Sequence, residues 1–122
     1  MAAVARSSAC FPCMPPGYEV VSAAAVAGEA LTAGDLVVLT ATGWFKSTAT
    51  NPANKRGFAA QNYKAGQTNC SILFHGEMDG WTGLTPGVPL YPGAAGGLDD
   101  VAVTGFTGLI HALSATRVGF TL

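Results

Sequence analysis

GEMDGWTGLTPGVPLY, residues 76 to 91, is the stretch of sequence that says most about the fold. It sets six glycines or prolines among a few apolar residues and contains no catalytic signature. Such a composition is typical of a chain that turns sharply between short strands, because glycine reaches positive φ at no steric cost and proline fixes its own φ. The stretch therefore predicts an all-β fold.

The same arrangement of turns and short apolar runs continues upstream. Residues 28–60, GEALTAGDLVVLTATGWFKSTATNPANKRGFAA, contain a Gly-Asp turn, an apolar run, an aromatic return and a small-residue strand. Short apolar runs separated by glycine predict a small, single-domain β-barrel or sandwich. The expected strands are Tyr18–Ala25, Leu36–Ala41, Trp44–Lys46, Arg56–Tyr63, Cys70–His75, Pro89–Tyr91, Val101–Val103, Ile110–Ser114 and Val118–Leu122.

The segments between these strands differ in composition. Thr42-Gly43 has the length of a tight hairpin turn, whereas Ser47–Asn54, STATNPAN, is a polar loop that we expect to project as a mobile tip. Three prolines confine Leu84–Gly93 to an edge or loop. The alanine-rich segment Ser22–Ala30 is compatible with a short helix, since alanine is the best helix former, but a strand or loop is favoured there.

The first 17 residues predict an extended N-terminal arm, followed by a β domain over residues 18–122. Prolines in the sequence CFPCMPPG, residues 10–17, disfavour a helix and favour an extended conformation. Apolar side chains in such an arm are costly to expose, so we expect them to dock on a neighbouring surface. The predicted interface residues are Phe11, Met14, Pro15, Pro16, Tyr18 and, in the domain itself, Trp81.

Composition excludes several classes of protein. The chain has 122 residues, of which 49% are hydrophobic and only 11% are charged, and its formal net charge is -1. Soluble domains usually carry roughly 25% charged residues. The surface of this chain is therefore expected to carry few charges, which suits burial in an assembly. Only Lys55 and Arg56 form an adjacent basic pair, and we therefore expect no nucleic-acid binding. Residues 20–33 are interrupted by Gly28 and Glu29, so no membrane segment is expected.

The cysteines and the N-terminus point to a reducing compartment. Only nine residues precede Cys10, and they include no apolar core of a signal peptide. We therefore expect synthesis in the cytoplasm. Three cysteines, an odd number, argue against a disulfide framework.

Cys10 and Cys13 have the spacing of half a zinc site. A tetrahedral site needs four ligands, and only Cys70, His75 and His111 are available to complete it. There is no second CxxC and no histidine pair, so the cysteines are better explained as small apolar residues, and no metal is expected.

Catalysis and cofactor binding are not expected either. His75 and His111 are the only candidates for a general base. The sequence has no G-x-S-x-G nucleophile motif, and a lone histidine on a strand is more often a hydrogen-bonded packing residue. We therefore predict that the protein is not an enzyme.

Four aspartates raise the possibility of calcium binding, but no D-x-D-x-D-G loop is present to gather their oxygens. They are better explained as residues that form turns. These aspartates are Asp35, Asp79, Asp99 and Asp100.

Seven aromatic residues are the expected core and interface anchors. Trp81 is flanked by Gly80 and by Thr82-Gly83, so it is the one that we expect to be partly exposed as a contact residue, with burial under its own loop as the alternative. The seven are Trp44, Phe45, Phe58, Phe74, Trp81, Phe106 and Phe120.

Three phrases, in this order, resemble the decoration or cement proteins on the capsids of tailed bacteriophages. They are LTAGDLV (residues 31–37), GWTGLTPGVPLY (80–91) and HALSAT (111–116). The resemblance covers residues 28–122. It implies a non-enzymatic virion structural protein, a homotrimer, on the capsid exterior. Its partner would be the major capsid protein, whose neighbouring subunits it would bridge to stabilise the shell.

Two alternatives stay open. A tail-fibre or receptor-binding module would share the glycine-rich β pattern. LTAGDLVVL also resembles the turn before a strand in lipoyl- and biotinyl-type carrier domains, which present a modified lysine at a hairpin tip. Lys46 lies close to the Thr42-Gly43 turn but not at it, so this resemblance is the weaker one.

Overall fold

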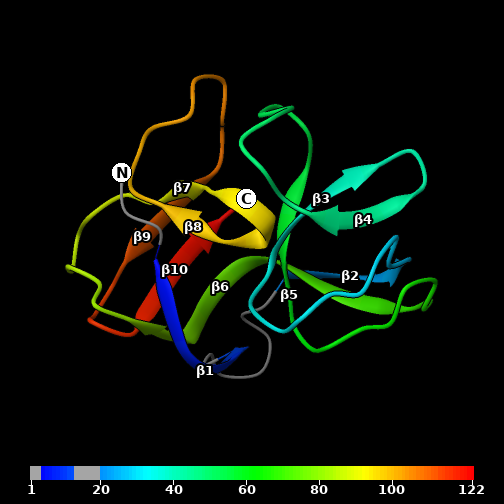
Figure 1. Ribbon diagram of the computed structural model, residues 1–122, viewed down its shortest axis with the longest axis horizontal. Helices are drawn as coiled ribbons and strands as arrows, with labels where there is room; N and C mark the ends of the chain where they lie inside the picture. Colours follow the sequence, from blue (N-terminus) through cyan, green and yellow to red (C-terminus); the bar gives the residue numbers. More distant parts are fainter. Residues whose placement is uncertain (1–3, 13–19) are drawn as a thin grey trace.

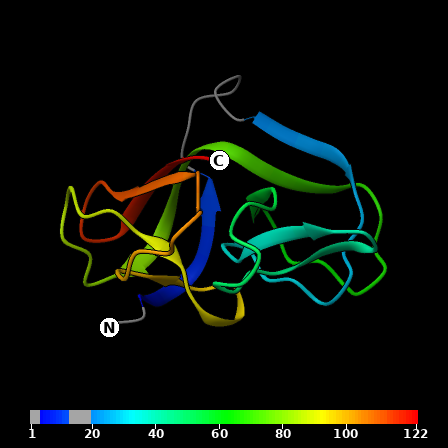
Figure 2. The ribbon, with the colours of Figure 1, turned by 90° about the horizontal axis from the view of Figure 1, so that it is seen from above.

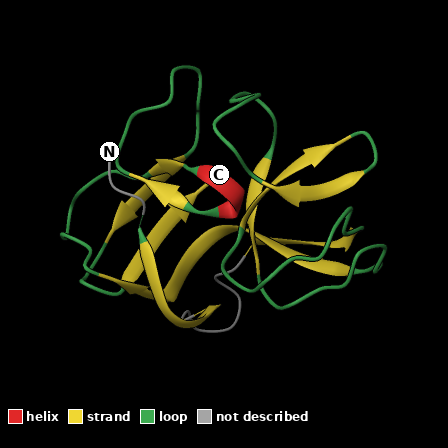
Figure 3. Ribbon diagram, viewed as in Figure 1, coloured by secondary structure: helices red, strands yellow, loops and turns green. Residues whose placement is uncertain are grey.

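The computed structural model describes residues 4–12 and 20–122, and it confirms the all-β class. Within these residues there are ten strands and one helical turn, η1 (Figures 1 and 3). The elements are β1 (Ala5–Pro12), β2 (Val20–Ala25), β3 (Leu36–Thr40), β4 (Gly43–Lys46), β5 (Arg56–Ala59), β6 (Cys70–Thr82), β7 (Tyr91–Pro92), η1 (Ala94–Gly96), β8 (Leu98–Asp99), β9 (Leu109–Ala112) and β10 (Arg117–Thr121).

Eight of these strands form one antiparallel sheet. Its order is β4-β3-β5-β6-β10-β9, while β1 and β2 also pair with β6. Strands β7 and β8 form a separate pair. The order of the described strands ends at β4 and at β9 and does not close into a barrel, so the structure supports the all-β class without the finer expectation of a barrel.

The 13-residue strand β6 organises the sheet because it is paired along both edges. Leu73 lies opposite Phe58 of β5 on one edge and Val21 of β2 on the other. Further along, Met78 lies opposite Val118 of β10 and Pro12 of β1. Strand β6 therefore links two groups of strands, β2–β5 and β1 with β7–β10, which lie to either side in Figures 1 and 2.

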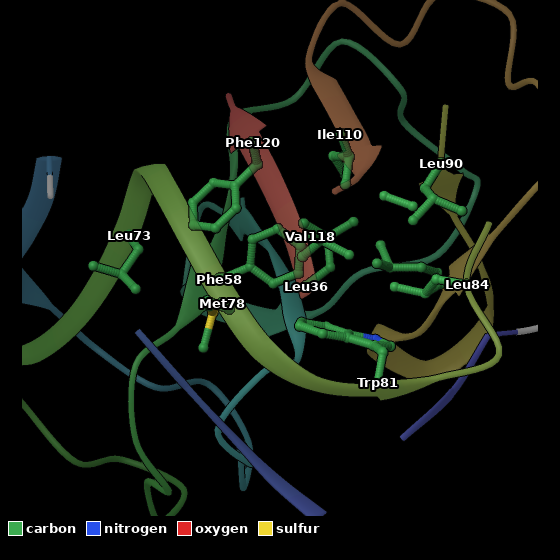
Figure 4. Packing of buried hydrophobic residues seen from close by; sticks show 12 residues of the cluster. Leu36, Phe58, Leu73, Met78, Trp81, Leu84, Leu90, Ile110, Val118 and Phe120 are labelled. Carbon is green, nitrogen blue, oxygen red and sulfur yellow. The ribbon is translucent and has the colours of Figure 1, made fainter. Parts of the chain in front are cut away.

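The described hydrophobic residues form two cores, and β3, β5 and β6 contribute to both. On β6 the adjacent residues Ile72 and Leu73 are both buried, each in a different core. The large core, shown in Figure 4, consists of Leu36, Phe58, Leu73, Met78, Trp81, Leu84, Leu90, Leu98, Ile110, Ala112, Val118 and Phe120. The small core consists of Ala25, Ala27, Leu31, Val37, Trp44, Ala59, Tyr63, Cys70 and Ile72.

Close approach of β5 to β6 depends on a glycine. A β-carbon at Gly57 would lie 2.5 Å from Cγ2 of Ile72 and 2.8 Å from the carbonyl oxygen of Leu73. The next residue, Phe58, is fully buried and sets its ring 4.5 Å from that of Phe120 and 5.9 Å, edge-on, from that of Trp81. Edge-to-face contacts of this kind add to the stabilisation from burial.

The aromatic predictions are confirmed for most positions. Trp44, Phe58, Trp81 and Phe120 are buried. Phe74 and Phe106 are partly buried and pack against the small and the large core respectively.

Three expectations about secondary structure are corrected or decided. Cys70–His75 was too short, because β6 continues to Thr82 through the glycine-rich sequence. The reason is that both edges of this second half are occupied, by β10 and β1. Val101–Val103 is not a strand, and β8 precedes it. In the alanine-rich segment, the strand ends at Ala25 and no helix forms, because β2 pairs with β6.

The expectation that the N-terminal arm orders only on a neighbour is wrong for β1. Ala5–Pro12 is extended, as predicted, but it pairs with β6 of its own chain, with Ala5 opposite Thr82 and Pro12 opposite Met78. The edge of β6 opposite β10 provides the hydrogen-bonding groups that hold it. Met14, Pro15, Pro16 and Tyr18 lie outside the described residues, as does the side chain of Phe11.

Replacement of Trp81 by alanine should lower the free energy of unfolding by about 3–5 kcal/mol, because its side chain is 1% exposed in the large core. Urea denaturation measures this loss. Leu109→Ala, at a position 60% exposed, is the control and should change stability by less than about 0.5 kcal/mol. Equal stability of the Trp81 variant and the wild type would contradict this description of the core.

Candidate functional site

Two buried polar side chains fix the loops at the junction of the two groups of strands. The first is Arg56, at the start of β5 and 2% exposed. Its Nε donates to Ser47 Oγ at 2.7 Å. Its two terminal nitrogens donate to the carbonyl oxygens of Thr48, Thr50, Asn51 and Asn54 at 2.7–3.3 Å.

These contacts give the Ser47–Asn54 loop an internal anchor. The five donors of a guanidinium group match the five bonds made here, and burial lowers the pKa of Arg56. The prediction of a polar loop is confirmed, but its backbone wraps around a buried cation. The sequence analysis noted Arg56 only as part of the adjacent basic pair with Lys55, and no local pattern indicated that it is buried.

The second buried polar side chain is Asp35, which is 2% exposed. One carboxylate oxygen accepts from Arg6 Nη2 at 2.8 Å, and the other accepts from the backbone N–H of Thr32 at 2.9 Å. Gly96 in η1 lies against this carboxylate with φ +80°, and a β-carbon there would lie 3.1 Å from Cγ of Asp35. The same glycine donates its N–H to the carbonyl of Ser47. The ion pair thus connects β1, η1 and the anchored loop.

The turn role predicted for the aspartates holds for Asp35, which closes a turn with Thr32, and for Asp99 at the end of β8, but it is wrong for Asp79, which lies within β6. Asp79 accepts from the N–H of Gly80 at 2.9 Å, and Asp99 accepts from the N–H of Val101 at 3.2 Å. Hydrogen bonds from the Thr116 hydroxyl and the Gly80 N–H, with the nearby Arg117, lower the pKa of Asp79.

The metal candidates do not converge within the described residues. Cys70 is buried and its thiol lies 3.4 Å from the carbonyl oxygen of Gln67. His75 shares a hydrogen bond with Thr121, and His111 forms a β-bridge with Pro89. No group of three potential metal ligands occurs in this part of the chain. The side chain of Cys10 and all of Cys13 lie outside the described residues.

Lys46 does not sit at a hairpin tip. It lies at the far end of β4, opposite Val37, and is half-buried, with its backbone N–H bonded to Glu29. A hairpin forms here as predicted, but its two-residue turn is Ala41-Thr42, because Thr40 pairs with Gly43 and Gly43 already belongs to β4. The lysine is thus separated from the position that a carrier domain uses.

The expectation that Trp81 is exposed is wrong. Its alternative, burial under its own loop, is what the structure has, since Trp81 and Leu84 both belong to the large core. The tryptophan is anchored because Trp81 and the neighbouring Gly80 donate their backbone N–H groups to the carbonyl of Thr116. It has no surface to offer a partner in this conformation.

Exposed apolar side chains gather instead along β9. Leu109 is 60% exposed and Leu113, just after the strand, is 46% exposed. Alternation along a strand places them with His111 on the outer face, while Ile110 and Ala112 enter the large core. The side chain of Leu113 lies over Gly119 of β10, since a β-carbon at Gly119 would lie 2.8 Å from Cδ1 of Leu113. We call Leu109, His111 and Leu113 the β9 face.

Comparison of the chain with protein-family models, with curated proteins and with solved structures finds no match. The described residues include no helix with the length and hydropathy needed to cross a membrane.

Arg56→Lys should destabilise the protein by about 2–4 kcal/mol, because three ammonium donors replace five and leave at least two of the five acceptor oxygens without their partner. Urea denaturation gives the loss, and hydrogen exchange should show faster opening of the Ser47–Asn54 loop. Lys55→Arg, at the exposed neighbouring position, is the control. Unchanged stability and exchange in Arg56→Lys would show that the guanidinium group is not the anchor.

Proposed function

We propose that this chain is a non-enzymatic virion structural protein. It decorates the outer surface of a phage capsid and stabilises the shell by bridging neighbouring subunits of the major capsid protein. Synthesis in the host cytoplasm and assembly as a homotrimer are part of the proposal. The tail-fibre or receptor-binding module is the alternative within structural proteins.

The observation that carries this proposal is the β9 face. In an antiparallel sheet the outward positions of a strand are normally polar when that face meets water. On β10 and β6 they are polar, and Arg117 lies 3.6–3.7 Å from Glu77 and Asp79. On β9 the outward positions are Leu109 and His111, and Leu113 follows directly after the strand. An apolar strip beside a polar rim is the composition of a protein contact.

The three phrases behind the resemblance support the proposal through their places in the fold. LTAGDLV contains the turn at Asp35, GWTGLTPGVPLY runs from the end of β6 into β7, and HALSAT forms the turn between β9 and β10. Each phrase therefore specifies a connection of the fold, and the last one lies beside Leu113.

Rigidity around the anchored loops supports a stabilising role. A specific contact buries about 800 Å² per partner, and association costs less when the binding surface is already ordered. Arg56 and Asp35 hold the connecting loops by 2.7–3.3 Å hydrogen bonds. A bridging protein with loops held in this way would resist deformation when the shell is under internal pressure.

Phage particles that lack the protein should release DNA at a lower temperature or at a milder osmotic shock than wild-type particles. Thermal release of DNA measured by dye fluorescence checks this, and adding back the purified protein is the control. Release of DNA at the same temperature by particles with and without the protein would contradict the proposal. Quantitative mass spectrometry of the particle separates the alternative, because hundreds of copies fit a shell protein and a handful fit a tail.

Leu109→Asp combined with Leu113→Asp should weaken binding to purified capsids by about tenfold or more, because both side chains would be buried in the contact. Sedimentation of the protein with capsids measures the affinity. Leu39→Asp, at a position 42% exposed and in β3, is the matched control. A folded double variant that binds as tightly as the control would remove the β9 face from the contact.

A further inference from the structure

A groove of about 490 Å³ lies between the anchored loop and the segment that follows β7. Thr48 and Ala49 form one wall, Pro92–Ala94 form the base, and Val101–Val103 form the other wall. The two loops that border it project from the upper side of the molecule in Figure 1. Its volume falls in the range of small-molecule sites.

One charged group lines this otherwise apolar groove. Asp99 of β8 is 5% exposed, and its Oδ1 accepts from the Val101 N–H at 3.2 Å. None of the ion pairs between described residues involves Asp99. This differs from Asp35, which is 2% exposed and has Arg6 beside it. A buried carboxylate is stabilised by a positive partner, and none of the residues that line the groove is basic.

We propose that the groove binds a small organic cation, an ammonium group on an apolar body, whose charge lies against the Asp99 carboxylate. The apolar walls would cover the body of the ligand, and the carboxylate would select the charged head. An inorganic cation fits less well, because hard metal ions need several oxygen ligands and this groove supplies one carboxylate.

The walls are already held in place. Arg56 binds the carbonyl of Thr48, and Gly96 donates to the carbonyl of Ser47, which fixes the first wall. Gly93, in the segment that forms the base of the groove, donates its backbone N–H to the carbonyl of Gly97 at 2.9 Å. Preorganised walls lower the entropy lost on binding. The proposal does not depend on the capsid role.

The test is an NMR titration of the full chain with benzylammonium chloride and, separately, with benzyl alcohol, a neutral molecule of similar shape. Benzylammonium should bind about tenfold more tightly and shift the amide signals of Thr48, Ala49 and Val101–Val103. Asp99→Asn, which keeps an acceptor for the Val101 N–H, should abolish that preference. Ala49→Phe should block both molecules, since it fills the groove.

Equal affinity of wild type for the two molecules would overturn the proposal, as would shifts confined to residues outside the groove. This comparison uses only the wild-type chain, so it remains decisive if Asp99→Asn fails to fold. Loss of capsid binding in the leucine variants with intact benzylammonium binding would show that the two sites are independent.

Discussion

The pairing of β6 along both of its edges is the constraint on which the rest of the structure depends. Its first half lies between β5 and β2, and its second half lies between β10 and β1. A strand with neighbours on both sides has no free edge for aggregation, and a slip by one residue would reverse which side chains enter the cores. Ile72 belongs to the small core and its neighbour Leu73 to the large core, so the register of β6 fixes both cores at once.

Buried polar contacts then connect the two groups of strands that β6 links. The Arg6–Asp35 ion pair joins β1 to the turn before β3, and Gly96 contacts both this carboxylate and the anchored loop. Arg56 completes the connection through Ser47. Buried polar groups stabilise a structure only when every partner is present, and here the carbonyls of one loop are matched to one guanidinium group. Specific geometry, more than hydrophobic burial, positions the loops that line the groove.

The sequence predicted what local chemistry determines. Glycine and proline turns predicted the all-β class and, to within one residue, the hairpin between β3 and β4, and short apolar runs located most strands. It failed where distant partners decide the outcome. The glycines between Gly76 and Gly83 looked like turn residues, yet two occupied edges keep them in β6 as far as Thr82. Trp81 looked exposed between glycines, yet Phe58 and Leu84 cover it. The Arg56 anchor and the apolar groove depend on loops far apart in sequence, so no local pattern indicated them.

The two faces of β9 argue for a role in contact with another molecule. Ile110 and Ala112 fill the large core, so the strand needs no apolar residue on its other side in order to fold. Leu109 and Leu113 occupy that side all the same, while β10 and β6 present charged or polar residues at the equivalent outward positions. Exposed leucines on the outer side of a strand whose inner side already fills a core are typical of a surface that another molecule covers. In this chain the inner cover is the large core, and the proposed capsid contact supplies the outer one.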